Sequence, residues 1–376
     1  MYVHISDSAY LVADLSQVMT PALAIYPELV DANIDATLKV LGGDPGRWRP
    51  HVKTAKLGYT MKRMVDRGVR AAKCATTLEL LTACEAGVDD VLLAYSVVGA
   101  NAARVGQIAA AFPKTTISVL VETPEQAAPW VDSGIGVFLD VNSGMDRTGI
   151  EQDHVQSIVS LARASAAGFR GLHYYDGHVH KDNHAERQAL AWAGYDKLME
   201  LVKACEAGGA HVGEVITSGT PALPCGAAYP GFQNAGFIHR VSPGTVVYND
   251  ASSLEQLDGL GYQAAAVVIA TVVSHPIPGR FTCDAGHKSV SADSGVPTCV
   301  VAGHLNFTPR KPSEEHLPID VTEGPVPPIG SIVYLVPRHV CPTVNNFDHA
   351  LMVERGRITS VEPVTARGHE KAFSLK

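Results

Sequence analysis

The sequence has no run of basic residues and no long apolar segment. Its 30 Lys and Arg residues are outnumbered by 38 Asp and Glu residues, for a formal net charge of -8, so nucleic acid and anionic membranes are not expected partners. No stretch approaches the ~18 uninterrupted apolar residues of a membrane helix. Residues 1–8 also lack the basic and apolar segments of a signal peptide. These absences predict a cytoplasmic protein with no membrane partner.

Closely spaced cysteine pairs are missing as well. The seven cysteines are scattered and include no CxxC pair, which argues against a disulfide framework and fits reduced thiols. Apolar residues make up 46% and charged residues 18% of the chain, a balance typical of a well-packed enzyme rather than a disordered protein. A chain of 376 residues is too long for one ordinary core, which predicts one large barrel plus a smaller domain.

Strand-like and helix-like segments alternate through the first two thirds of the chain. Strands are expected at 48–54, 71–76, 90–96, 115–122, 136–142, 169–176, 214–219 and 239–247. Helices are expected between them at 57–67, 77–86, 101–112, 124–132, 151–166 and 184–207. This alternation predicts an α/β fold, the (β/α)8 TIM barrel, with a flat doubly wound sheet of fewer strands as the alternative.

The pattern changes after residue 250. Short β-rich runs are separated there by glycine and proline, and no long helical pattern appears. This predicts a mostly antiparallel β domain. We therefore expect a barrel over residues 26–250, followed by a β domain over 251–376 that the N-terminal strand within 1–25 joins.

Lys53 leaves an apolar neighbourhood at the end of the first expected barrel strand. Burying an ammonium group is unfavourable unless something uses it. A desolvated lysine has a lowered pKa and forms a Schiff base with a carbonyl compound, most commonly pyridoxal phosphate. His51 precedes it by two residues, so on a strand both side chains would leave the same face. A surface lysine in a basic turn is the alternative.

Residues 215–221 end the seventh expected barrel strand in a small, hydroxyl-rich turn, and residues 241–245 form a similar turn near the eighth. In (β/α)8 barrels the loops after strands 7 and 8 commonly form a phosphate site, because exposed N–H groups and hydroxyls converge there. Ordinary turns are the alternative. Together with the lysine on the first strand, the two turns predict a phosphorylated cofactor.

Polar clusters follow two further strands. Arg147, after the fifth, is suited to neutralise a phenolate or phosphate oxygen, although a solvated loop arginine explains it equally well. Histidines and tyrosines crowd residues 173–180, where their rings are suited to stack on a planar cofactor and to relay protons. A metal site made of these histidines is the competing interpretation.

His339 and Cys341 form the sharpest local pattern. Alternating residues of an extended segment point to one side, so the imidazole and the thiolate are placed to bind one ion. This pair favours zinc over magnesium or calcium. Only two local ligands would leave positions open, as in a catalytic site. In a chain with 16 histidines, a chance pair is the alternative.

Taken together, the motifs resemble those of a known family. In order they read PHVKTAK, GMDRTGI, GLHYYDGHVH, SGTP, SPGT, DAGHKSVS, SEEHL and RHVCPTV. This series resembles the D-threonine aldolase and D-serine dehydratase group of the alanine-racemase-like, pyridoxal-phosphate-dependent enzymes. The similarity runs from about Thr20 to Val361.

The resemblance implies a role for each motif. It implies a Schiff base on Lys53, with Lys56 the poorer candidate, and an Arg147 that approaches the phenolic oxygen of the cofactor. It implies a divalent metal, zinc or manganese, at His339 and Cys341. It also implies a homodimer. The groups that would hold the phosphate are Ser218, Gly219, Thr220, Gly244 and Thr245.

Two positions depart from the family pattern. Ser242 stands where many relatives have an arginine facing the pyridine nitrogen, so the ring is expected to stay unprotonated and to be only a modest electron sink. The usual ring-facing histidine falls at Tyr175, with His178 as the alternative stacking residue.

The function that the resemblance implies is a lyase acting on β-hydroxy D-amino acids. Retro-aldol cleavage would convert a D-threonine-type substrate to glycine and an aldehyde, with His178 or His51 as the base. Dehydration of D-serine or 3-hydroxy-D-aspartate to a keto acid and ammonia is the alternative, with Lys53 taking the Cα proton. An amino-acid racemase needs no metal pair, and a non-catalytic pyridoxal-phosphate carrier lacks a C-terminal β domain, so both rank lower.

Overall fold

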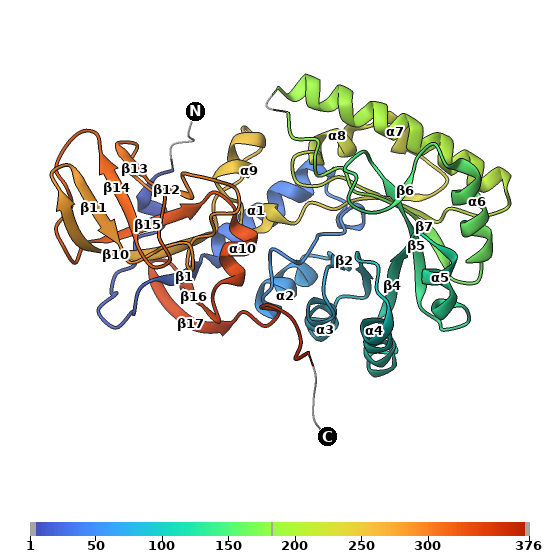
Figure 1. The fold of residues 1–376 in the computed structure, drawn as a ribbon, viewed down its shortest axis with the longest axis horizontal. Helices are drawn as coiled ribbons and strands as arrows, with labels where there is room; N and C mark the ends of the chain where they lie inside the picture. Colours follow the sequence, from blue (N-terminus) through green and yellow to red (C-terminus); the bar gives the residue numbers. More distant parts are fainter. Residues whose placement is uncertain (1–4, 182, 373–376) are drawn as a thin grey trace. The chain divides into compact units, whose positions relative to one another are not determined.

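The computed structural model describes residues 5–181 and 183–372. By their internal contacts, residues fall into two compact units (Figure 1). Among the described residues, the barrel unit comprises 38–53, 61–181, 183–244 and 369–372, and the β unit comprises 5–37, 54–60 and 245–368. The domain boundary expected at residues 250 and 251 stays a prediction.

A parallel sheet forms the barrel unit, in the order β2-β3-β4-β5-β7-β8-β9. A two-residue strand, β6 (Ile150–Glu151), pairs with β5. The other strands are β2 (Ala71–Cys74), β3 (Asp90–Leu93), β4 (Thr116–Val121), β5 (Gly136–Asn142), β7 (Phe169–Tyr174), β8 (Glu214–Thr217) and β9 (Ile238–Val241).

The first expected barrel strand, 48–54, survives only as two isolated parallel bridges. Trp48 bridges to Val241 of β9 and His51 bridges to Lys73 of β2, so this segment lies between the two ends of the sheet. Pro50 has no N–H to donate to a ladder, and residues 52–55 form a turn. The expected (β/α)8 architecture is confirmed, with its first strand shortened.

Helices follow most of the strands and lie outside the sheet (Figure 1). The first of them begins at a cap that the sequence encodes locally: Thr76 Oγ1 accepts the Glu79 N–H at 3.0 Å, while the Glu79 carboxylate accepts the Ala75 N–H at 2.7 Å. The helices are α3 (Thr77–Glu85), α4 (Gly99–Ala111), α5 (Pro124–Ala127), α6 (Val155–Ala164), α7 (His184–Ala207) and α8 (Leu223–Ala228). Helices α1 (Pro27–Val40) and α2 (Gly58–Asp66) contribute residues to both units.

One expected helix is interrupted. Residues 124–132 form the single turn of α5 and then a 3-10 turn at Ala128–Trp130. Pro129 lacks the N–H that a continuous α-helix would use there. The remaining 3-10 turns are Asp7–Ala9, Pro45–Arg47, Pro230–Phe232 and Thr245–Val247.

Buried ion pairs close the N-terminal end of the barrel. Arg49 is fully buried and contacts Glu214 at 2.8 Å and Asp90 at 2.7 Å. Glu214 and Asp90 are the first residues of their strands, and Arg170 and Arg240 contact the same carboxylates. Burial alone would lower the pKa of Arg49, but the two carboxylates raise it. Buried ion pairs thus occupy the N-terminal end of the barrel, whereas the candidate site lies at the C-terminal ends of the strands.

The β unit is a mostly antiparallel sheet in the order β13-β14-β11-β10-β1-β16-β17, with β15 pairing with β10 and β12. The N-terminal strand β1 is antiparallel to β10 and parallel to β16. Helices α9 (Ala251–Gln256) and α10 (Val340–Asn345) also belong to the unit. The strands are β1 (Ala22–Ile25), β10 (Ala266–Ile277), β11 (Arg280–Cys283), β12 (Cys299–Val301), β13 (Phe307–Pro309), β14 (Leu317–Val321), β15 (Ile332–Pro337), β16 (His349–Glu354) and β17 (Arg357–Pro363).

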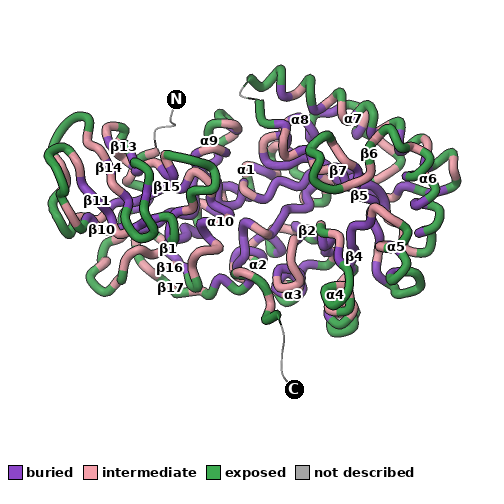
Figure 2. The backbone as a smooth tube through the Cα atoms, in the orientation of Figure 1, coloured by how far each residue is buried: buried purple, intermediate pink, exposed green. Residues whose placement is uncertain are grey.

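Burial follows the strands in each unit (Figure 2). The residues of β2 are all buried, as are all but the first of β3. Exposed residues gather on the outer faces of α4 and α7 (Figure 2). Every described helix is too short or too polar to span a lipid bilayer.

Replacing Arg49 with methionine should destabilise the barrel unit. Glu214 would lose its fully buried partner, and breaking a buried ion pair from one side costs about 3–5 kcal/mol. The free energy of unfolding from urea titration measures this loss. As a control, Arg70→Met removes an exposed pair whose nearest N–O distance is 3.9 Å, and should change that free energy by less than about 1 kcal/mol. An equal effect of both changes would contradict the role of the buried cluster.

Candidate active site

Lys53 lies in the turn formed by residues 52–55, and its side chain is half-buried. Its backbone N–H donates to His51 Nδ1 at 3.3 Å. The expectation that both side chains leave one face of a strand is therefore wrong, because the extended segment ends at His51, Lys53 lies in the turn that follows, and the His51 ring folds back onto that turn. This contact commits one ring nitrogen of His51 to holding the backbone of Lys53.

Three cationic side chains surround the ring of Tyr175. The Lys53 Nζ is 5.9 Å from the ring centroid, the Lys73 Nζ 5.0 Å and the Arg147 Cζ 5.2 Å. They come from the first barrel segment, from β2 and from the loop after β5. Cations over an aromatic face are stabilised by its quadrupole. The cluster suits a planar, anionic ligand.

Lys73 is a site residue that the sequence patterns did not reveal. It is 1% exposed, and its Nζ lies 3.2 Å from His173 Nε2. Desolvation, together with the nearby charge of Lys53, lowers the pKa of Lys73 to about 7. The available signal was a single charge within the apolar strand β2, the same kind of signal that singled out Lys53.

His173 is held by a buried carboxylate. Its Nδ1 lies 2.8 Å from Asp140 Oδ1, and Thr148 donates to the other oxygen of Asp140 at 2.7 Å. Burial opposes the charge on Asp140, but the hydrogen bond with His173 keeps the pKa of the carboxyl below its usual value. Burial and Lys73 lower the pKa of His173. Asp140 is thus the hydrogen-bond partner that orients the His173 ring.

In the turn after β8, some of the hydrogen-bonding groups already have partners within the protein. Ser218 has a positive φ of 65°, and its buried Oγ lies 3.1 Å from the Tyr195 hydroxyl. The Gly219 N–H donates to Asp176 at 2.9 Å. Burial raises the pKa of Asp176. The Thr220 N–H, by contrast, finds no acceptor in residues 5–181 and 183–372.

The turn after β9 forms a cradle. A Cβ on Gly244 would stand 2.3 Å from the His51 carbonyl oxygen, so only glycine fits. The buried Ser242 Oγ has no hydrogen-bond partner among the described residues. A buried, unsatisfied hydroxyl is unfavourable unless a ligand completes it. Together with the three cations, these features fit pyridoxal phosphate, with Ser242 available to the ring and backbone N–H groups available to the phosphate. Thr245 belongs to the β unit.

Two other expected residues take different positions. His178 lines a cavity of 360 Å³ whose lining includes neither Lys53 nor Tyr175, and its Nδ1 is buried without a partner among the described residues. Lys56 is buried in the β unit and donates to the Ala366 carbonyl at 3.1 Å. Its role is thus to hold the chain near residue 366.

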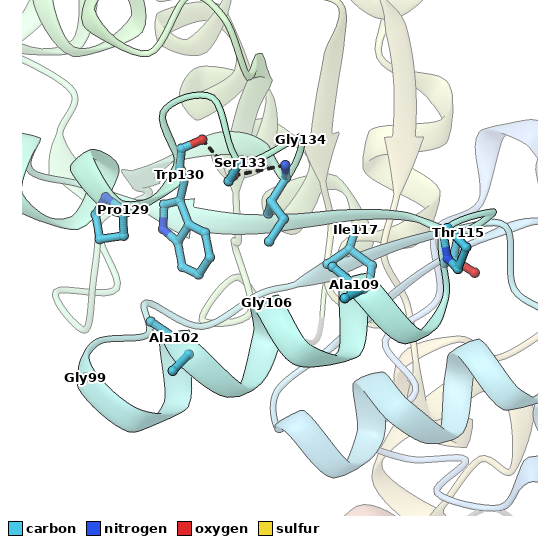
Figure 3. A pocket seen from close by; sticks show the side chains of 14 residues that line it. Gly99, Ala102, Gly106, Ala109, Thr115, Ile117, Pro129, Trp130, Ser133 and Gly134 are labelled. Carbon is cyan, nitrogen blue, oxygen red and sulfur yellow. Dashed lines mark hydrogen bonds between the residues drawn. The ribbon is translucent and has the colours of Figure 1, made fainter.

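A larger groove of 630 Å³ lies between α4 and the segment 129–135 (Figure 3). Its lining is mostly small or apolar and includes Gly106, Ala109 and Trp130. None of the lining residues carries an ionisable side chain, so this groove is not the place for acid–base chemistry.

In the β unit, His339 and Cys341 lie at the start of a helix. His339 is the N-cap of α10 and Cys341 is in its first turn, so the expectation of an extended His-Val-Cys segment is wrong. The Val340 N–H donates to Asp250 at 3.0 Å, a contact that satisfies the helix N-terminus. Cys341 Sγ lies 3.0 Å from the Thr54 hydroxyl and 3.7 Å from that of Thr245.

The His339 side chain is oriented by a carboxylate. Its Nδ1 lies 2.6 Å from Asp293 Oδ2, so Nε2 is the ring nitrogen that Asp293 does not hold. Burial alone would lower the pKa of His339, but Cys341 and Asp293 raise it to about 9. An imidazole and a thiol with an outer carboxylate form a donor set that suits zinc. No cluster of three or more His, Cys, Asp or Glu residues with ligand geometry occurs in the described chain.

The chain is similar to known proteins over nearly its whole length. A D-threonine aldolase from an Arthrobacter species is 28% identical over 372 residues, covering 95% of each chain. A 3-hydroxy-D-aspartate aldolase from Paracoccus denitrificans is 28% identical over 376 residues, covering 94% of each. The crystal structure of D-threonine aldolase from Filomicrobium marinum superposes with a TM-score of 0.85 at 27% identity, over 95% of this chain and 98% of that one.

Family models match both parts of the chain. The D-serine dehydratase domain model matches residues 265–353, and a D-threo-3-hydroxyaspartate dehydratase structure from a Delftia species shares the fold with a TM-score of 0.80 at 21% identity, over 94% of this chain and 99% of that one. The model of the alanine racemase N-terminal domain matches residues 25–251, more than half of the chain. The predicted resemblance is confirmed, and the chain belongs to the alanine racemase N-terminal domain family.

Proposed function

We propose that this protein is a pyridoxal-phosphate- and divalent-metal-dependent lyase that cleaves β-hydroxy D-amino acids of the D-threonine type to glycine and an aldehyde. The observation that carries the proposal is the Lys53 amine, which shares the Tyr175 ring with Lys73 and Arg147. The Arthrobacter and Paracoccus aldolases, similar over nearly their whole length, support the reaction class. The small-molecule substrate is thus an amino acid.

The residues proposed to bind the cofactor have separate tasks. Lys53 would carry the cofactor, while Thr220, Gly244 and the neighbouring Thr245 would hold its phosphate through backbone N–H groups and hydroxyls. Pyridoxal phosphate, when bound, supplies the electron sink that lets a bond at the substrate Cα break. Ser242 carries no charge, so it would leave the pyridine nitrogen unprotonated.

His339 and Cys341 would hold the divalent ion, zinc or manganese, and its chemistry there is to polarise a hydroxyl oxygen. A base must then take the hydroxyl proton. We propose the imidazole of His178 for this step, because its Nδ1 has no hydrogen-bond partner among the described residues. His51 is the second candidate, since its Nδ1 already accepts the Lys53 N–H and its Nε2 then carries the ring proton.

Dehydration to a keto acid and ammonia is the alternative function. The D-serine dehydratase domain model covers residues 265–353, which include His339 and Cys341, and this match favours the alternative. In that reaction Lys53 would take the Cα proton. We also propose that the protein is cytoplasmic, because its scattered cysteines without a CxxC pair fit reduced thiols. On the resemblance alone, we propose that it works as a homodimer.

The substrate test separates the two reactions. Purified protein with pyridoxal phosphate and zinc or manganese is incubated separately with D-threonine, D-serine and their L forms. We expect glycine and acetaldehyde from D-threonine only, and no product after chelation of the metal. Lys53→Ala should give no product under any condition.

Formation of a keto acid and ammonia from either D substrate would show that the protein is a dehydratase rather than an aldolase. Activity that survives complete chelation would leave the His339–Cys341 pair without a metal role. Turnover by Lys53→Ala would contradict the assignment of Lys53.

Asp293→Asn should weaken zinc binding by about 10–100-fold, because carboxylates that orient a histidine ligand contribute that much to metal affinity. Isothermal titration with zinc measures the change. His339→Ala should abolish the site, and Asp258→Asn, an exposed carboxylate of the same unit, should leave the affinity unchanged. Wild-type affinity in Asp293→Asn would mean that Asp293 does not orient the ligand.

A further inference from the structure

Lys73 is the most buried cation near the proposed cofactor site, at 1% exposure, whereas Arg147 is exposed. It lies on β2, directly beside the segment that carries Lys53. Its N–H donates to the Pro50 carbonyl at 2.9 Å, and its carbonyl accepts the Val52 N–H at 2.8 Å. The backbone of residue 73 is thus fixed against the two residues on either side of His51, and the Lys53 turn follows immediately.

The side chain is fixed as firmly as the backbone. Because Asp140 accepts from His173 Nδ1, the His173 Nε2 is left as an acceptor for the Lys73 amine at 3.2 Å. The chain Lys73–His173–Asp140 ends at Thr148, which donates to Asp140. This arrangement holds a lysine in place without neutralising it, since its contact is an imidazole rather than a carboxylate. Among the described residues, no carboxylate forms an ion pair with Lys73, Lys53 or Arg147.

The structure of pyridoxal phosphate indicates which of its groups the Lys73 amine would contact. The phenolic oxygen of pyridoxal phosphate is attached to the ring carbon next to the one that bears the carbon joined to the lysine. The ring carbon on the other side bears the phosphate arm, which the proposed function assigns to the turns after β8 and β9. An amine near Lys53 that belongs to neither turn is therefore available to the phenolic oxygen. A buried cation also interacts more strongly with a neighbouring negative charge than an exposed cation does, because the local dielectric constant is lower.

We propose that Lys73 is a further cofactor-contacting residue, which pairs with the phenolic oxygen of pyridoxal phosphate and lowers the proton affinity of the Lys53 linkage. His173 and Asp140 are its positioning residues. The inference rests on the proposed function, in that it takes Lys53 as the attachment point. It adds a second lysine to the chemistry of that site.

The charges around Lys73 are consistent with this role. The groups that face it are Lys53, Arg147, His173, Asp140, Asp176 and the Tyr175 ring. Burial and Lys53 lower the pKa of Lys73 to about 7 without a ligand, so part of the amine is neutral near neutral pH. A phenolate oxygen beside it favours the charged form. Lys73 would then supply a positive charge where the ligand brings a negative one.

The test follows the visible absorbance of the bound cofactor, without substrate. Lys73→Met holoenzyme is titrated from acid to alkaline pH beside the wild type. Removing a cation within about 4–6 Å raises a neighbouring pKa by about 1–3 units, so the midpoint of the spectral transition should rise by that amount, a tenfold or greater gain in proton affinity. Lys62→Met, an exposed lysine paired with Asp66, is the matched control and should not move the midpoint.

Lys73→Gln carries the test if the methionine variant does not fold, because the amide keeps an N–H for His173 and removes only the charge. An unchanged midpoint in a folded, cofactor-bound variant would overturn the assignment of Lys73 and leave the proposed function intact. A wild-type protein with no titrating visible band would overturn both. A raised midpoint in Lys73→Met or Lys73→Gln, with Lys62→Met unchanged, supports the proposal.

Discussion

The segment from Trp48 to His51 lies between β9 and β2 and places the turn that carries Lys53. It is fixed by parallel bridges at its two ends, by the Arg49 N–H donating to Val241 at 2.9 Å and by the Trp48 indole donating to Pro243 at 3.0 Å. The buried guanidinium of Arg49 then ties the segment to the first residues of β3 and β8. Lys53 lies in a turn just after these restraints. The position of its amine therefore depends on the segment from Trp48 to His51, which pairs with its neighbours only through two isolated bridges.

Charge is handled differently at the two ends of the barrel. At the N-terminal end, Arg49, Arg170 and Arg240 meet Asp90 and Glu214 directly, so the ions compensate one another within the protein. At the C-terminal end, Lys53, Lys73 and Arg147 face an aromatic ring, and the one direct polar contact of the Lys73 amine is an imidazole. Cations left without direct carboxylate partners are suited to an anionic ligand. The first arrangement stabilises the fold, and the second prepares the site.

Much of the barrel could be predicted because its signals are local. Apolar runs in regular alternation with helical segments indicate the strands, and the cap at Thr76 and Glu79 is written within four residues. The shortening of the first strand was harder to predict, although Pro50, which has no N–H to donate to a ladder, is a local signal for it. The helix at Val340–Asn345 could not be predicted from the His-Val-Cys motif alone. The carboxylate that accepts its first N–H belongs to Asp250, which is far away in the sequence.

The candidate site was predictable to a similar degree. Lys53 and Arg147 stand out in turns after strands, where few packing roles exist for them, and they do lie around one ring. Lys73 and Asp293 were missed for different reasons. Lys73 has no neighbouring motif, and its partner His173 lies on another strand. Asp293 belongs to a polar loop whose composition predicts only a turn, and its contact with His339 is made by the tertiary fold.

The most direct test of this account asks which amine carries the cofactor. Enzyme loaded with pyridoxal phosphate is reduced with borohydride, digested and analysed by peptide mass spectrometry. The account predicts the phosphopyridoxyl mass on the peptide that contains Lys53 and on no other. The same mass on Lys73 or Lys56, or its absence from every lysine, would contradict it.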